Sequence, residues 1–289
     1  MRFGAYFAYW EKEWACDYAR YIEKVKRLGF DALEISGAGI MTMDDGELAA
    51  FGRKAEKAGV ELSACIGLPK ELDVSSLDEK VREAGTGYMK EMFGRLEKAG
   101  IDLLGGIIYS YWPADYSESP DKPAVRAASI KSMRELAAAA KKHNVTLALE
   151  TVNRFEQFII NDAKEAVAFV EEIGAENVKV MLDSFHMNIE EDSMGGAIKT
   201  AGKHLGHFHI GECNRKVPGK GHMQWDEIGE ALRDIGYDGR VVMEPFVRPG
   251  GGVGRDIKVW RDLSDGADEA KLDSDIAEAL RFVKGCFCR

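Results

Sequence analysis

Four short apolar runs in the second half of the chain end on a residue that can bind a metal or transfer a proton. They deliver a glutamate, an aspartate, a histidine and a second glutamate, at Glu150, Asp183, His209 and Glu244. A carboxylate at the end of a buried strand is costly to desolvate unless something positive meets it. Three carboxylates that point together also repel one another unless a cation lies between them. The four residues are therefore candidate ligands of one divalent cation.

The donor set narrows the choice of ion. An oxygen-rich site with a single imidazole suits Mn²⁺, Co²⁺ or Mg²⁺ better than it suits a structural zinc ion, which prefers thiolates. The alternative is that each carboxylate only forms a salt bridge with a nearby arginine or lysine. That alternative explains any one of the residues, but it does not explain why all four occupy corresponding positions on consecutive strands.

The elements that must position these residues alternate regularly between strand and helix, as judged from hydrophobic periodicity. The expected strands cover residues 2–9, 31–35, 60–66, 101–109, 145–150, 178–183, 205–210 and 240–246. The expected helices cover residues 18–28, 44–58, 78–99, 122–142, 162–173, 194–201 and 225–235, followed by a helical tail at about 272–283. Glycines that typically end a helix in the left-handed conformation follow several of these helices, at Gly29, Gly59, Gly100, Gly174 and Gly236.

Alternating strands and helices in this number predict a closed (β/α)8 barrel, the α/β fold known as the TIM barrel, as a single domain over residues 1–289. The length suits this fold, for which about 250 residues is typical. The C-terminal ends of the strands, with the loops that follow them, form the active face of such barrels. Successive candidate ligands are roughly 30 residues apart, which is the length of one strand–helix unit. Strands five to eight should therefore bring all four to one rim.

Composition argues against several other classes of protein. The net charge of −10 and the pI near 5.3 offer no basic surface to nucleic acid or to an anionic membrane. No run reaches the roughly 20 apolar residues of a membrane span, and the N-terminus lacks a signal-peptide pattern. The five cysteines, an odd number without paired-ligand spacing, indicate reduced thiols and a cytoplasmic protein. Cys286 and Cys288 could bind a metal, although incidental thiols in a frayed tail explain them more simply.

Segments 183–192, 206–215 and 243–246, each around a candidate ligand, carry a recognisable combination of residues. Segments 109–113, 150–156 and 259–262 extend the pattern over essentially the whole chain. Together they closely resemble the ketose 3-epimerases, the D-tagatose and D-psicose (D-allulose) 3-epimerase group of the xylose-isomerase-like barrels. The combination is far more specific than any single motif.

The resemblance implies a role for each residue of the expected site. The four candidate ligands would bind the metal, and two of them, Glu150 and Glu244, would also be the acid and base catalysts. The residues around O2 of the ketose would be His186, Arg215 and Glu156. The apolar wall of the pocket would consist of Tyr6, Trp112 and Phe246. The alternatives are that Trp112 packs within its loop, that Tyr6 packs within the core, and that Arg215 extends into solvent.

This assignment agrees with the chemistry of epimerisation. The reaction removes a proton from one face of a carbon next to a carbonyl and returns a proton to the opposite face. Two glutamates on opposite faces of an enediolate can do this, while a metal polarises the carbonyl and stabilises the developing oxyanion. We therefore expect interconversion of D-fructose and D-psicose, and also of D-tagatose and D-sorbose, with Mn²⁺ or Co²⁺ as the cofactor. Relatives form dimers or tetramers, so we expect a homodimer or homotetramer.

Other functions are compatible with parts of this sequence pattern. An aldose–ketose isomerase or a sugar-phosphate epimerase could use the same barrel, and the glycine run at 250–254 follows strand eight, where phosphate-binding loops often lie. A metal-dependent phosphodiesterase would need a cluster of several histidines and a basic face, which six histidines and a charge of −10 do not favour. A non-catalytic sugar-binding protein would not need two glutamates at a metal. Outside the site we expect His204 and His207 to be structural, and His143 and His222 to face solvent.

Overall fold

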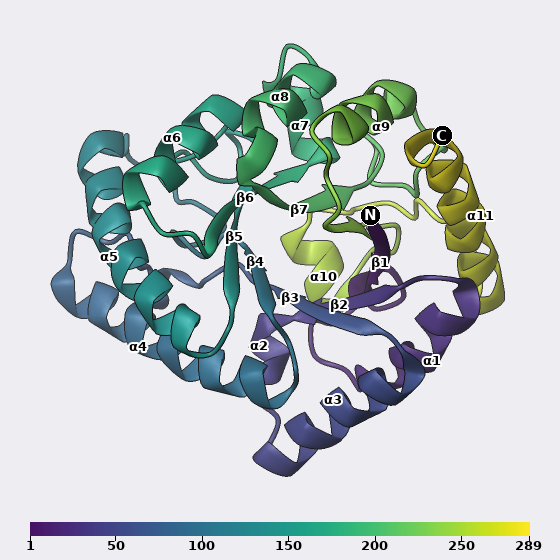
Figure 1. Cartoon of the computed structure of the whole chain (residues 1–289), viewed down its shortest axis with the longest axis horizontal. Helices are drawn as coiled ribbons and strands as arrows, with labels where there is room; N and C mark the ends of the chain where they lie inside the picture. Colours follow the sequence, from purple (N-terminus) through teal and green to yellow (C-terminus); the bar gives the residue numbers. More distant parts are fainter.

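Eight parallel strands close into a barrel and follow one another around it in chain order (Figure 1). The computed structural model describes residues 1–289. The strands are β1 (Arg2–Tyr6), β2 (Ala32–Ser36), β3 (Glu61–Cys65), β4 (Leu103–Gly106), β5 (Thr146–Thr151), β6 (Val178–Asp183), β7 (Leu205–Ile210) and β8 (Arg240–Met243). The first and last strands pair with each other and close the ring. The predicted (β/α)8 fold is thereby confirmed.

Helices surround the strands on the outside of the barrel, and α10 lies inside their ring (Figure 1). The α-helices are α1 (Ala19–Leu28), α2 (Gly37–Ile40), α3 (Asp45–Ala58), α4 (Glu79–Lys98), α5 (Lys122–Lys142), α6 (Ala163–Ile173), α7 (Ser184–Glu190), α8 (Met194–Ala201), α9 (Trp225–Asp234), α10 (Gly251–Asp256) and α11 (Glu269–Phe287). Short 3-10 helices are η1 (Phe7–Tyr9), η2 (Lys70–Leu72) and η3 (Gly202–His204). No helix combines the length and the apolar character needed to cross a membrane.

Local side-chain chemistry explains where the outer helices begin and end. Asp44 caps α3 by accepting a hydrogen bond from the backbone N–H of Glu47, whose own carboxylate returns a bond to the Asp44 backbone. Asp162 caps α6 by accepting a hydrogen bond from the backbone N–H of Glu165. The predicted glycine C-caps at Gly29, Gly59 and Gly174 all have left-handed backbone conformations, as a residue without a Cβ atom permits.

The structure differs from the expected elements mainly at the rim of the barrel. The expected first strand is shorter, because its last residues, 7–9, form η1. The expected fourth strand ends at Gly106, where a φ of +106° turns the chain out of the sheet. The short helices α2, α7 and α10 were not expected, because four to seven residues are too few to display helical periodicity. These differences all lie where the chain leaves the barrel to build the loops of the active face.

The interior of the barrel is not uniformly apolar. Most buried side chains form one continuous apolar cluster that spans the strands and the inner faces of the helices. Within it lies a small polar group contributed by β2, β3 and β7, made of Glu34, Ser63, His207 and His209, all of them fully buried. A buried charge needs hydrogen-bond partners, so the carboxylate of Glu34 must find its donors within this group.

Candidate active site

The ligand atoms of Glu150, Asp183, His209 and Glu244 all lie within 4.8 Å of one another, and all four residues are buried. They come from the C-terminal ends of β5, β6 and β7 and from the position directly after β8. Asp183 and His209 are register partners in the pairing of β6 with β7, which places them side by side at the rim. The parallel barrel thus brings together four residues that are far apart in the sequence.

A cavity of about 330 Å³ opens above this cluster. Eight of the ten residues predicted for the site line it, namely Tyr6, Trp112, Glu150, Glu156, His186, Arg215, Glu244 and Phe246. The other two, Asp183 and His209, are 1% and 0% exposed and are not among the residues that line the cavity. The volume is at the lower end of the range for small-molecule pockets. The cavity therefore suits a ligand of the size of a single monosaccharide.

Arg215 brings a positive charge to the carboxylates. Its guanidinium lies 3.5 Å from oxygens of both Asp183 and Glu244 and 3.8 Å from Glu156. The same group stacks on the ring of Phe185, 3.6 Å from its centroid. Stacking on an aromatic face and ion pairing hold a guanidinium more firmly than either does alone. Arg215 is therefore a fixed part of the cavity wall, rather than a side chain that extends into solvent.

The imidazole of His186 is held from behind by Asn153. The backbone N–H of Asn153 points at Nδ1 of His186 at 3.2 Å, and its side-chain Nδ2 lies 2.7 Å from the same atom. The Asn153 side chain is oriented by Phe155, whose backbone N–H donates to Oδ1. Because both groups at Nδ1 are donors, Nδ1 must accept, and the proton of the neutral ring resides on Nε2. That N–H points toward Glu150 and Asp183, at 3.8 and 3.7 Å.

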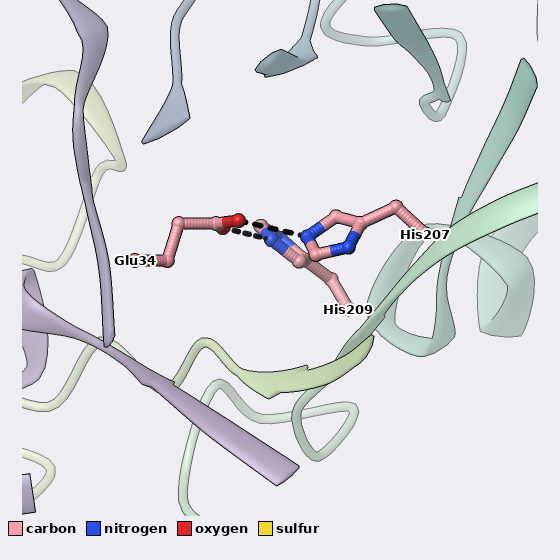
Figure 2. Close-up of side chains that lie close together, drawn as sticks. All are labelled: Glu34, His207 and His209. Atoms are coloured by element: carbon pink, nitrogen blue, oxygen red, sulfur yellow. Dashed lines mark hydrogen bonds and ion pairs between the residues drawn. The ribbon is translucent and has the colours of Figure 1, made fainter. Parts of the chain in front are cut away.

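The other imidazole of the site, His209, is oriented by Glu34. Nε2 of His209 is hydrogen bonded to Oε1 of Glu34, and Nε2 of the neighbouring His207 lies 2.8 Å from Oε2 (Figure 2). Burial alone would raise the pKa of Glu34, but the two imidazoles outweigh burial and hold that pKa well below the usual glutamate range. The expectation that His207 is structural agrees with these contacts.

The surroundings of the other ring nitrogen of His209, Nδ1, show whether a cation would fit among the neighbouring carboxylates. Nδ1 of His209 is buried, has no hydrogen-bond partner, and lies 3.3 Å from Oε1 of Glu244. Burial and the carboxylate of Glu244 raise the pKa of Glu150 well above its usual value. Protons are thus held in the cluster at positions where a divalent ion would replace them. An unpartnered imidazole nitrogen beside three carboxylates fits Mn²⁺, Co²⁺ or Mg²⁺.

The glycine run at 250–254 has a packing explanation that does not involve phosphate. A Cβ atom on Gly251 would lie 2.2 Å from the backbone oxygen of Lys12, and the φ of Gly251 is +67°. The backbone N–H of Gly252 donates to the carboxylate of Glu13 at 3.0 Å. A phosphate at this point would meet that carboxylate, so the loop favours close packing of α10 against the segment that follows η1.

Several residues of the site were missed from the sequence. Asn153 and Phe185 lie within segments that carried the resemblance, but neither was assigned a role. Glu34 was also missed, although an acidic residue flanked by apolar neighbours within an expected strand is a detectable signal. Trp14, which was assigned no role, lines the cavity as well.

Comparisons with known proteins agree with this architecture. A family model described as xylose isomerase-like TIM barrel matches residues 22–267. The D-psicose 3-epimerase of Ruminiclostridium cellulolyticum is 51% identical over 284 residues, which cover 98% of this chain and 97% of that protein. A solved structure of D-psicose 3-epimerase with D-tagatose from Clostridium cellulolyticum superposes with a TM-score of 0.98 at 50% identity, covering 99% of both chains. A solved structure of D-psicose 3-epimerase in the presence of D-fructose gives the same values.

Proposed function

We propose that this chain, which belongs to the ketose 3-epimerases of the xylose isomerase-like TIM barrel family, interconverts D-fructose and D-psicose by metal-dependent epimerisation at C3. D-Tagatose and D-sorbose, which are related to each other by the same change at C3, form the second expected substrate pair. The observation that carries the proposal is the cluster of Glu150 and Glu244 with Asp183 and His209 beneath a cavity of monosaccharide size.

Glu150 and Glu244 act as the two bases. They come from β5 and from the end of β8, which are not neighbours in the barrel, and both line the cavity. A sugar bound between them presents one face of C3 to each carboxylate. One glutamate removes the C3 proton and forms the enediolate, and the other delivers a proton to the opposite face.

His186 and Arg215 bind the sugar at its carbonyl end. The Nε2–H of His186 and the guanidinium of Arg215 both point toward the carboxylate cluster. From there they donate hydrogen bonds to O2, where negative charge develops as the enediolate forms. A divalent ion held by Glu150, Asp183, His209 and Glu244 would polarise the carbonyl and offset the same charge.

The remaining cavity residues orient the sugar and limit access of water. The indole Nε1 of Trp112 donates to Glu156 at 2.9 Å, which fixes the ring as part of the wall. Tyr6 and Phe246 pack edge to face with centroids 6.1 Å apart. We propose that these rings contact the carbon skeleton of the ketose, since apolar surfaces of a sugar pack well against aromatic rings.

Proton NMR of D-fructose incubated in D₂O with the Mn²⁺-loaded protein tests the proposed function. The expected result is D-psicose, with deuterium incorporated at C3. Deuterium at C1 would instead indicate an aldose–ketose isomerase, and turnover of D-fructose 6-phosphate alone would indicate a sugar-phosphate epimerase. If neither D-fructose nor D-tagatose acquired label at C3 after loading with Mn²⁺ or Co²⁺, the proposal would be wrong.

Asn153→Ala should lower kcat/KM for D-fructose roughly three- to tenfold, the effect of losing one net hydrogen bond. The variant removes the side-chain donor that holds Nδ1 of His186 while leaving the backbone donor in place. Asn161→Ala is the matched control, because Asn161 bonds carbonyls of the same loop without touching His186. Equal losses in both variants would assign the effect to the loop rather than to the imidazole.

A further inference from the structure

Glu34 occupies an unusual position for a carboxylate. It lies on β2, is fully buried, and does not line the substrate cavity. His207 and His209 lie two residues apart on β7, so their side chains share the face that points into the barrel. Figure 2 shows Glu34 on one side of the barrel interior and the two imidazoles on the other, with a bond from each imidazole to the carboxylate.

We propose that Glu34 is a positioning residue that fixes the tautomer and orientation of His209, so that Nδ1 presents its lone pair to the divalent cation. This inference rests on the metal dependence included in the proposed function. An ionised carboxylate can only accept hydrogen bonds. The ring nitrogen that faces it must therefore carry the proton, and the other nitrogen of the same neutral ring must be unprotonated.

The contacts of Glu34 leave it no freedom to rotate. One oxygen, Oε1, accepts from His209. The other, Oε2, accepts from Nε2 of His207 at 2.8 Å and from the hydroxyl of Ser63 at 2.7 Å. Ser63 is the register partner of Glu34 on β3, so the carboxylate is held from its own side of the barrel as well as from β7. His207 thus acts as a brace that keeps Oε1 directed at His209.

The unpartnered state of Nδ1 in His209 supports this assignment. Nδ1 is buried without a hydrogen-bond partner in both His207 and His209, and that of His209 lies 3.3 Å from Oε1 of Glu244, a residue of the ligand cluster. If the proton moved from Nε2 to Nδ1, Glu34 would lose a bond and the N–H would occupy the cation's place. A carboxylate behind a metal-binding imidazole also makes it a stronger ligand, and losing such a partner typically weakens metal affinity about 10- to 100-fold.

Glu34→Gln tests the proposal with a nearly isosteric side chain. Glutamine offers one oxygen acceptor and one NH₂ donor, so it cannot accept from both imidazoles. At least one of them must switch its proton to Nδ1, and His209 loses its anionic partner in either case. We expect the dissociation constant for Mn²⁺, measured by electron paramagnetic resonance of the free ion, to rise about tenfold or more.

A second measurement reads the tautomer directly and needs no variant. In Mg²⁺-loaded wild-type protein labelled with ¹⁵N-histidine, long-range ¹H–¹⁵N NMR spectra should show His207 and His209 both protonated at Nε2. In Glu34→Gln, at least one of the two should be protonated at Nδ1. A purely structural role for Glu34 would lower thermal stability but would leave the Mn²⁺ affinity of the folded protein unchanged.

Ser63→Ala is the matched control, because it removes the third bond to Glu34 without touching either imidazole. We expect His207 and His209 to stay protonated at Nε2 in this variant. The Mn²⁺ dissociation constant should change by less than about twofold, well below the change expected when a metal-binding histidine loses its carboxylate partner. A wild-type His209 without a proton on Nε2 would overturn the proposal. So would Mn²⁺ affinity in Glu34→Gln within about twofold of wild type, or an equal loss in Ser63→Ala.

These outcomes are separable from those of the proposed function. A protein that binds Mn²⁺ with the expected dependence on Glu34, yet leaves C3 of every ketohexose unlabelled in D₂O, would refute the epimerase activity alone. A protein that epimerises D-fructose but binds Mn²⁺ equally well with glutamine at position 34 would refute the role of Glu34 alone.

Discussion

Glu150→Gln and Glu244→Gln should each lower the rate of D-fructose epimerisation by between about 10² and 10⁴, the contribution of a positioned acid or base. The loss follows because each glutamate serves one face of C3 and neither can serve both. Glutamine keeps an oxygen that can bind the cation, so metal content should fall less than activity. Initial rates, with bound metal measured on the same samples, check the prediction.

Isotope exchange gives this prediction a sharper form. With one base removed, the remaining carboxylate can still take the C3 proton from the epimer that presents it to that side. It can then only return a proton to the same face. Each variant should therefore exchange solvent deuterium into one epimer without forming the other, and the two variants should label opposite epimers. Proton NMR of D-fructose and D-psicose, each incubated separately in D₂O, would reveal this complementary pattern.

Asp183→Asn is the control that separates base chemistry from metal loss. Asp183 belongs to the ligand cluster but does not line the cavity, so it has no access to C3. Its variant should lose exchange into both epimers equally and should recover at high Mn²⁺ concentration. The two-base mechanism would be contradicted if Glu150→Gln or Glu244→Gln labelled both epimers, or if either kept turnover close to that of the wild type.

The sequence predicts that the four candidate ligands lie close together, for a simple geometric reason. In a parallel barrel every strand delivers its last residue to the same rim. Once the strands are recognised, a glutamate, aspartate or histidine at the end of an apolar run can therefore be placed at that rim. No contact between the residues needs to be deduced, and the ligand atoms of Glu150, Asp183, His209 and Glu244 do lie close together.

The residues that hydrogen bond to the histidines of the site and orient them could not be predicted in the same way. Glu34 and His209 are 175 residues apart, and their contact crosses the barrel interior between strands that do not pair. Strand pattern alone does not say which inward-facing side chains share a layer. The contact of Asn153 with His186 depends on the conformation of the loop after β5 and on α7, a seven-residue helix that periodicity cannot reveal.

Removal of the metal should destabilise the protein, and the difference in stability between metal-loaded and metal-free forms should widen as pH rises. In the metal-free form, burial and Glu244 raise the pKa of Glu150 above its usual value. The folded state therefore holds a proton that the unfolded chain has already released. Stability conferred by that proton is lost as pH rises from the ordinary glutamate value, about 4.3, through the raised pKa. A divalent ion replaces the proton, so the metal-loaded protein does not lose this stability. The increase in the free energy of unfolding that the ion provides therefore grows with pH.

The expected size of the effect follows from mass action. A free metal concentration 100 times the dissociation constant stabilises the folded state by about 2.7 kcal/mol. For a chain of 289 residues, with an unfolding entropy of about 2.1 cal/mol/K per residue, that corresponds to a rise in Tm of roughly 4 °C. Thermal melts of chelator-treated and Mn²⁺-loaded protein, recorded at a series of pH values above the ordinary glutamate pKa, would measure both the rise and its pH dependence.

Glu191→Gln provides a matched control for the role of the ligand cluster. Burial raises the pKa of Glu191 as well, but its carboxylate accepts from the backbone N–H of Ala163 and is not part of the ligand cluster. Its replacement should change the Tm of the metal-loaded and of the metal-free protein by the same amount, so the difference between the two Tm values should stay the same. Glu150→Gln should instead reduce the widening of that difference with pH, because one of the groups that hold an extra proton is gone. A difference in Tm that stayed constant with pH in the wild type would show that a cation does not replace protons in this cluster.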